Sequence, residues 1–161
     1  MKTPTPQNQL NDLIKSAPLD IQRHFGCDCA ERALDKDFRE DTSLLEALKT
    51  VRQHIDGYAN DEDLLDAHSI STNIFYQEKQ TEPERVYRVA EVVAHLCRPD
   101  PRITFVQQLS LWCIATSAVY SSSSQMEKGF LWHETWNTAY SDEFEWQKLH
   151  LCKLLDQLNS T

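Results

Sequence analysis

The spacing of apolar residues along the chain predicts α-helices almost throughout. In the clearest segment, apolar residues recur every three or four positions: Leu44, Leu48, Val51 and Ile55. This spacing places them on one face of a helix, which can then pack against a neighbour. Gly57 follows directly and predicts the end of this helix.

Residues with helix-capping chemistry precede the predicted helices. Ser43 and Glu46 have the spacing of a capping box, although Asp41 or Thr42 could cap the same helix. Residues 60–63, Asn-Asp-Glu-Asp, open the next helix, where anions suit the positive end of the helix dipole. Thr81 is the predicted cap of the helix that follows Pro83.

These signals predict an all-α fold, a single compact bundle of about six to eight helices over residues 1–161. Residues 1–8 are expected to be a flexible lead-in, with helices at about 8–17 and 18–38 after it. In the second of these, Gly26 and Ala30 would let a neighbouring helix approach closely. The segment 103–120 is apolar on nearly every side, which predicts the central helix. A loop is expected at 121–124 and a last helix at about 141–158.

Composition agrees with this architecture. The chain has 161 residues, of which 40% are hydrophobic, and only three are glycine. That length suits one domain that needs no disulfide or metal to fold. So few glycines leave little room for hairpins or for Gly-rich phosphate loops.

The charge balance excludes several kinds of partner. Lys and Arg number 16 against 25 Asp and Glu, which gives a formal net charge of −9. We therefore expect neither nucleic acid nor a membrane as a partner, because both are polyanionic. The acidic surface either keeps the protein soluble or forms a face for a basic partner.

The cysteines and the first residues indicate the compartment. Five cysteines are an odd number, and no apolar run follows Met1 and Lys2. The sequence therefore predicts reduced thiols, no signal peptide and a cytoplasmic location. No segment approaches the length and hydrophobicity of a membrane span.

No motif predicts catalysis, a metal site or a cofactor site. Cys27 and Cys29 would point about 200° apart on a helix, so they could not bind one ion together. We expect Cys29 in the core and Cys27 at the edge or on the surface. The protein is therefore predicted not to be an enzyme.

Acidic residues form the candidate binding faces. The first cluster, at 56–66, contains no Lys or Arg. The second cluster, at 134–145, is interleaved with aromatic residues, which often anchor interfaces inside a charged rim. The predicted partner-binding residues are Asp56, Asp61, Glu62, Asp63, Asp66, Trp132, Trp136, Glu143 and Glu145. The alternative interpretation is a solvated helix start beside an aromatic core.

Two segments resemble motifs of a known family. Residues 28–34 read Asp-Cys-Ala-Glu-Arg-Ala-Leu, and a helix containing residues 44–51 follows them. This resembles the D-C-A-E-x-x-L opening of the immunity proteins of bacterial polymorphic-toxin systems. Residues 143–151 are similar to the closing E-x-x-W-Q-x-x-x-L motif of that family. The chain departs from the family at 70–120, where the relatives are rich in alanine.

The resemblance implies a helical protein without catalysis or cofactor, which binds and neutralises a co-produced toxin. An acidic surface suits a basic toxin such as a nuclease. The sequence does not decide between a monomer and a homo-oligomer. One alternative is a small-molecule-binding or regulatory protein with an aromatic pocket near Trp112 and Trp136. The other is an enzyme that uses Cys27 or Cys113 with a histidine.

Overall fold

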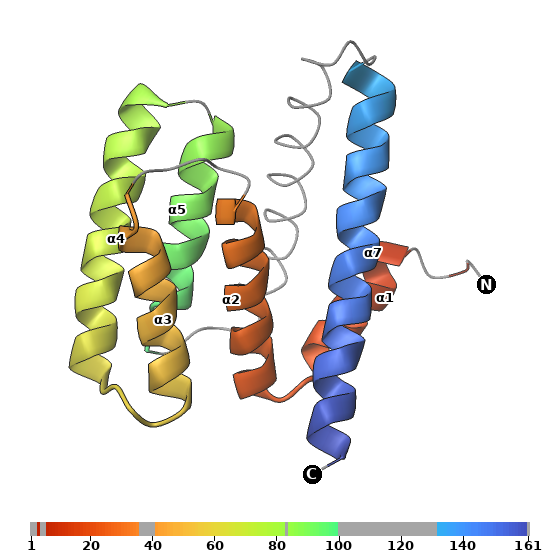
Figure 1. The fold of residues 1–161 in the computed structure, drawn as a ribbon, viewed down its shortest axis with the longest axis horizontal. Helices are drawn as coiled ribbons and strands as arrows, with labels where there is room; N and C mark the ends of the chain where they lie inside the picture. Colours follow the sequence, from red (N-terminus) through yellow and green to blue (C-terminus); the bar gives the residue numbers. More distant parts are fainter. Residues whose placement is uncertain (1–2, 4–5, 36–40, 83, 100–131, 161) are drawn as a thin grey trace.

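The structure is a computed structural model, which describes residues 3, 6–35, 41–82, 84–99 and 132–160. These residues form six α-helices and no strand (Figure 1), which confirms the predicted all-α bundle. The helices are α1 (Pro6–Ser16), α2 (Leu19–Asp35), α3 (Ser43–Ile55), α4 (Asp61–Thr81), α5 (Glu84–Leu96) and α7 (Trp132–Asn159). The segments predicted as a central helix (103–120) and as a loop (121–124) lie outside the described residues. No helix in the described part of the chain is long and apolar enough to cross a membrane.

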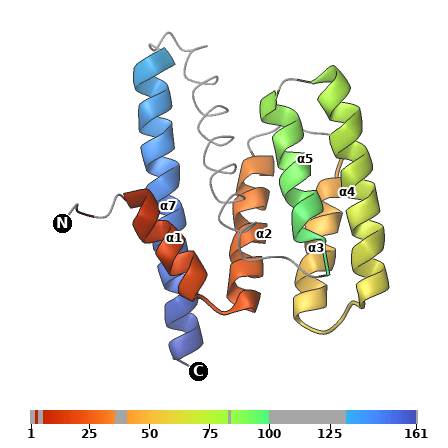
Figure 2. The same cartoon turned by 180° about the vertical axis from the view of Figure 1, so that it is seen from behind.

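Helix α2 stands between two groups of helices (Figures 1 and 2). On one side α3, α4 and α5 pack together, and α2 contacts both α3 and α5. On its other side α2 contacts α7, and α1 in turn packs against α7. Among the described helices, α2 therefore connects the two halves of the bundle.

Small residues allow α2 to occupy this position. Gly26, Ala30 and Ala33 are buried along the helix. A Cβ atom on Gly26 would lie 2.7 Å from Cδ2 of Leu96, so the Leu96 side chain of α5 packs directly on the α2 backbone and would have to shift if residue 26 were alanine. This confirms the predicted close approach of a neighbouring helix.

The core takes apolar side chains from every described helix. Each large apolar side chain that is fully buried stabilises the fold by roughly 1.5–3 kcal/mol relative to the same side chain exposed to water. The largest are Phe25, Leu10, Ile14, Leu44, Leu48, Leu64, Leu96 and Leu151.

Three helix ends differ from the predictions. Ser43 lies inside α3, and its backbone N–H and hydroxyl both donate to Oδ1 of Asp41, at 2.8 and 2.6 Å. The N-cap residue is Thr42, one of the two alternatives left open above, but its side chain makes no capping hydrogen bond, and Asp41, one position earlier, accepts the bonds from Ser43 instead. Helix α1 begins at Pro6 rather than at about 8, because the fixed φ of proline suits a first helical turn. Thr81 ends α4 instead of capping α5, and its hydroxyl donates to the carbonyl of Gln77 at 3.2 Å.

The last helix is longer than predicted. Helix α7 has 28 residues and extends from Trp132 through the predicted start at 141. Ser141 and Asp142 look like a helix start in the sequence, but both are exposed, and a helix can carry such residues on its solvent face.

We predict that Gly26→Val destabilises the protein by about 1–3 kcal/mol, because the added methyl groups overlap Leu96. Urea unfolding of the variant, alone and combined with Leu96→Ala, measures this effect. The penalty should shrink in the Leu96→Ala background, where the overlapping atoms are absent. An equal penalty in both backgrounds would contradict the proposed overlap.

Candidate functional site

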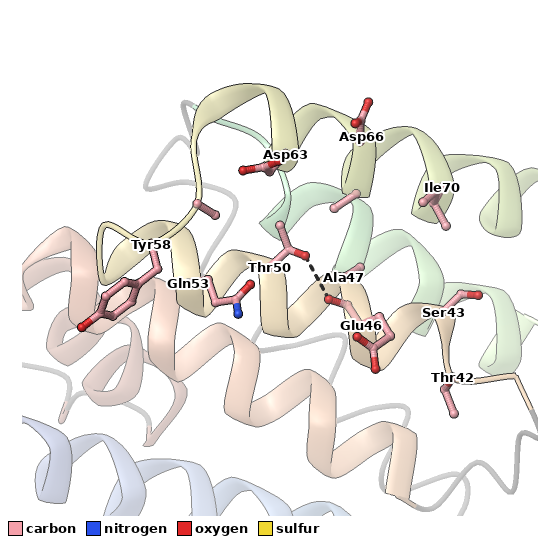
Figure 3. Close-up of a pocket in the computed structure, with 12 residues that line it drawn as sticks. Thr42, Ser43, Glu46, Ala47, Thr50, Gln53, Tyr58, Asp63, Asp66 and Ile70 are labelled. Atoms are coloured by element: carbon pink, nitrogen blue, oxygen red, sulfur yellow. Dashed lines mark hydrogen bonds between the residues drawn. The ribbon is translucent and has the colours of Figure 1, made fainter.

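An open groove of about 480 Å³ lies along the seam between α3 and α4 (Figure 3). One wall comes from α3, the other from α4, and the connecting turn supplies the residues at one end. The residues that line the groove are Thr42, Ser43, Glu46, Ala47, Thr50, Gln53, Tyr58, Ala59, Asp63, Asp66, Ala67 and Ile70.

Helical periodicity explains why these side chains share the groove. Residues 46, 50 and 53 on α3 follow the i, i+4, i+7 spacing of one helix face, and residues 63, 66 and 70 on α4 follow the equivalent i, i+3, i+7 spacing. Ala47 and Ala67 line the groove and are themselves buried, with exposed fractions of 4% and 6%. Because these side chains are short, they form a floor that leaves the seam open above it.

The groove carries negative charge from both walls. Glu46 projects from α3, whereas Asp63 and Asp66 project from α4, and all three are exposed (Figure 3). Within the described part of the chain, the lining residues include no lysine, arginine or histidine. The groove can therefore attract a cationic group, and salt would weaken that attraction.

A capping box holds Asp63 in position. The side chain of Asn60 accepts a hydrogen bond from the Asp63 backbone N–H at 2.9 Å. Asp63 Oδ2 in turn accepts one from the Asn60 backbone N–H at 3.0 Å. The acidic start predicted for α4 is thus confirmed, and it is stabilised by the positive end of the helix dipole.

The turn after α3 exposes Tyr58 at one end of the groove. Gly57 has a φ of 81°, a left-handed conformation that glycine adopts without steric penalty. The N–H of Gly57 donates to the carbonyl of His54, and that of Tyr58 donates to the carbonyl of Gln53, which is a Schellman motif. Gly57 thus ends the helix as predicted. Tyr58 is 86% exposed, which makes its ring available to a partner.

The first predicted acidic cluster is divided by the structure. Asp63 and Asp66 line the groove. Glu62 is exposed but lies outside it, Asp61 Oδ1 is 2.7 Å from Nε2 of His54, and Asp56 Oδ1 is 3.7 Å from Nε2 of His24. Sequence reasoning missed Glu46, because it was interpreted as a capping residue. The shared helix face of residues 46, 50 and 53 was the signal that could have identified it.

A hydrogen-bonded chain fixes the helices beside the groove. Arg23, 5% exposed, lies with its NH2 group 3.2 Å from Nδ1 of His54. Because arginine only donates, Nδ1 is the acceptor, and the other ring nitrogen donates to Asp61 at 2.7 Å. Burial lowers the pKa of Arg23. The chain joins α2, α3 and the start of α4.

The second predicted cluster is only partly on the surface. Glu143 is 1% exposed, and its Oε2 accepts a hydrogen bond from Nε of Arg32 at 2.8 Å. It therefore pairs within the protein rather than facing a partner. Glu145 is exposed on α7. Trp132 and Trp136 belong to α7, but their side chains are not among those that the structure describes.

The Arg32–Glu143 pair lies at one end of a row of side chains in contact between α2 and α7. We call this row the stacked ladder, and it consists of Arg32, Trp146, His150 and Asp28. The Arg32 guanidinium lies 4.4 Å from the centre of the Trp146 ring. The Trp146 and His150 rings stack at 4.7 Å with an angle of 13° between their planes. His150 Nε2 lies 2.7 Å from Oδ2 of Asp28.

Asp28 also connects this ladder to α3. Its Oδ1 accepts a hydrogen bond from Arg52 at 2.7 Å, and the same Arg52 nitrogen lies 2.7 Å from Oε2 of Glu31. Charged hydrogen bonds at these distances are stronger than neutral ones. One carboxylate on α2 thus contacts both α3 and α7.

The cysteines of the described residues are placed for packing. Cys27 and Cys29 are both buried, so the prediction of Cys27 at the edge or surface is wrong. The reason is that α2 packs against helices on opposite sides. Burial raises the pKa of Cys27 and of Cys97 to about 12. Within the described residues, no group of His, Cys, Asp and Glu side chains could hold a metal ion.

Comparison with known proteins identifies no relative, since no protein-family model, curated protein or solved structure matches the chain. The resemblance to immunity proteins therefore stays a prediction from residues 28–34 and 143–151. In the structure these two segments face each other, because Arg32 and Asp28 of the first bond to Glu143 and His150 of the second. The two motifs thus connect α2 to α7.

We predict that Arg32→Ala lowers the free energy of unfolding by about 2–4 kcal/mol, because buried Glu143 loses its guanidinium partner. Chemical denaturation measures the change. The matched control is Arg88→Ala, which removes an i, i+3 pair with Glu91 within one helix and should lower the free energy by less than about 1 kcal/mol. Equal effects of the two substitutions would contradict the prediction that the Arg32–Glu143 contact stabilises the fold more than a surface ion pair does.

We also predict that Cys27, Cys29 and Cys97 resist alkylation at neutral pH while the protein is folded. With a pKa of about 12 for Cys27 and Cys97, roughly one thiol in 10⁵ would be ionised at pH 7. Cys152 is only partly buried and should react. Mass spectrometry after iodoacetamide treatment, with urea-unfolded protein as the control, measures the labelling. Rapid labelling of Cys27 in the folded protein would instead favour the enzyme alternative.

Proposed function

We propose that this protein is a non-catalytic protein-binding module, an immunity protein that binds and neutralises a basic bacterial toxin. One observation carries the proposal: carboxylates from both walls line the open α3–α4 groove, and none of the lining residues that the structure describes is cationic. The net charge of −9 supports it, because a negative surface speeds the capture of a positively charged protein.

The stiffness of the scaffold supports a binding role. The Arg23–His54–Asp61 chain joins α2, α3 and α4 around the groove. The stacked ladder fixes α7 to α2. A binding surface that is already ordered loses little conformational entropy when a partner docks, so more of the contact energy appears as affinity.

The buried thiols favour binding over catalysis. A nucleophilic cysteine needs a lowered pKa and access for a substrate. Cys27 and Cys97 have neither, since both are fully buried and both have a pKa of about 12. Among the cysteines that the structure describes, these two are thus poor candidates for the enzyme alternative.

The test combines capture with neutralisation. The protein is used as bait in a lysate of the bacterium that encodes it, at low and at high salt. We expect one stoichiometric basic partner that is released as the salt concentration rises. That partner should stop growth when it is expressed alone in a laboratory strain, and co-expression of this protein should restore growth. A captured partner that does not affect growth, or no partner at either salt concentration, would contradict the proposal.

A further inference from the structure

We infer that the α3–α4 groove binds a short basic segment of the partner protein, with lysine or arginine side chains between its carboxylate-bearing walls and apolar side chains at its ends. The inference rests on the proposed function and adds to it the binding face and the chemistry of the segment.

The dimensions of the groove suit a peptide segment. It follows α3 from Thr42 to Gln53 and reaches Tyr58 in the turn (Figure 3). A helix of 13 residues is about 20 Å long at 1.5 Å per residue. An extended segment of about six residues covers the same distance at roughly 3.3 Å per residue.

The positions of the carboxylates suit alternating side chains. Glu46 stands on the α3 wall, while Asp63 and Asp66 stand one helical turn apart on the α4 wall (Figure 3). Successive side chains of an extended segment point in opposite directions. Two neighbouring basic residues can therefore reach opposite walls. A metal ion is not the expected occupant, because these carboxylates do not form a group that could hold one.

An exposed side chain with a large apolar part stands at each end of the groove, although the hydroxyl-bearing Thr42 and Ser43 also line the second end. Tyr58 at one end is 86% exposed, and Ile70 at the other end is 50% exposed. An exposed aromatic ring can pack against an aliphatic side chain or a guanidinium, and tyrosine is frequent among residues that dominate binding energy. The groove thus combines apolar surface at its ends with an acidic centre, and the segment that complements it has a basic centre and apolar ends.

The first experiment measures binding of a short fluorescent peptide with leucine at both ends and lysine and arginine between them. Fluorescence anisotropy at low salt compares the wild type with the triple variant Glu46→Gln, Asp63→Asn, Asp66→Asn. These isosteric changes are at exposed positions, and circular dichroism checks that the variant is folded. We expect the Kd to rise about tenfold or more, because each lost ion pair weakens binding by a few-fold.

The matched control separates the groove from the overall negative charge. The variant Asp12→Asn, Asp142→Asn, Asp156→Asn loses the same charge at exposed positions on α1 and α7. Its Kd should rise by less than about threefold, through weaker long-range attraction alone. Equal losses in the two triple variants would overturn the inference, as would the absence of peptide binding to the wild type.

A pair of tyrosine variants tests the aromatic end. Tyr58→Ala should raise the Kd about fivefold. Tyr76→Ala removes a 57% exposed tyrosine that does not line the groove and should leave the Kd unchanged. If Tyr58→Ala had no effect, the peptide would not reach that end and the inference would be wrong. If the toxin is captured and neutralised but the groove variants still bind it fully, this inference fails while the proposed function stands.

Discussion

The burial of α2 on opposite sides is the constraint on which the rest of the described structure depends. A helix in that position needs small residues where its neighbour is closest, and Gly26 meets this requirement by allowing Leu96 to approach its backbone. It also needs polar contacts along its edges, and Asp28 and Arg32 make these with α3 and α7. Apolar packing and charge pairing thus act along the same helix.

Helix α3 packs against α2 and α5 on its inner side. Its outer surface therefore remains available for binding. Helix α4 packs beside α3, and the short side chains of Ala47 and Ala67 leave the seam between them open. The groove is therefore mainly a product of helix packing, and the turn after α3 adds Tyr58 and Ala59 at one end of it. Its walls are as ordered as the helices that carry them, which suits a surface that binds without rearrangement.

The sequence correctly predicted that the chain is helical and where several helices end, because apolar periodicity and helix capping depend on residues that are close in sequence. Gly57 and the acidic start of α4 are examples. The sequence could not predict that Glu143 would be buried, because an acidic residue is normally expected on the surface. Its partner, Arg32, is more than a hundred positions away in the chain, so their contact is visible only in the folded structure. The sequence assigned Cys27 to the edge for a similar reason, since one helix alone does not reveal how many neighbours surround it. The groove itself was not predicted: Asp63 and Asp66 were among the predicted partner-binding residues, whereas Glu46 was interpreted as a capping residue, although its spacing to residues 50 and 53 placed it on the same helix face.

Asp28 couples the contacts of α2 with α3 to its contacts with α7. Its two carboxylate oxygens hold Arg52 of α3 and His150 of α7 at the same time. If α7 were to detach, Asp28 would lose one of two partners, and its remaining bond to α3 would stand in a more solvated and more weakly interacting environment. Detachment of α7 would therefore weaken a contact on the other side of α2, which is how one shared carboxylate can make separate contacts open together.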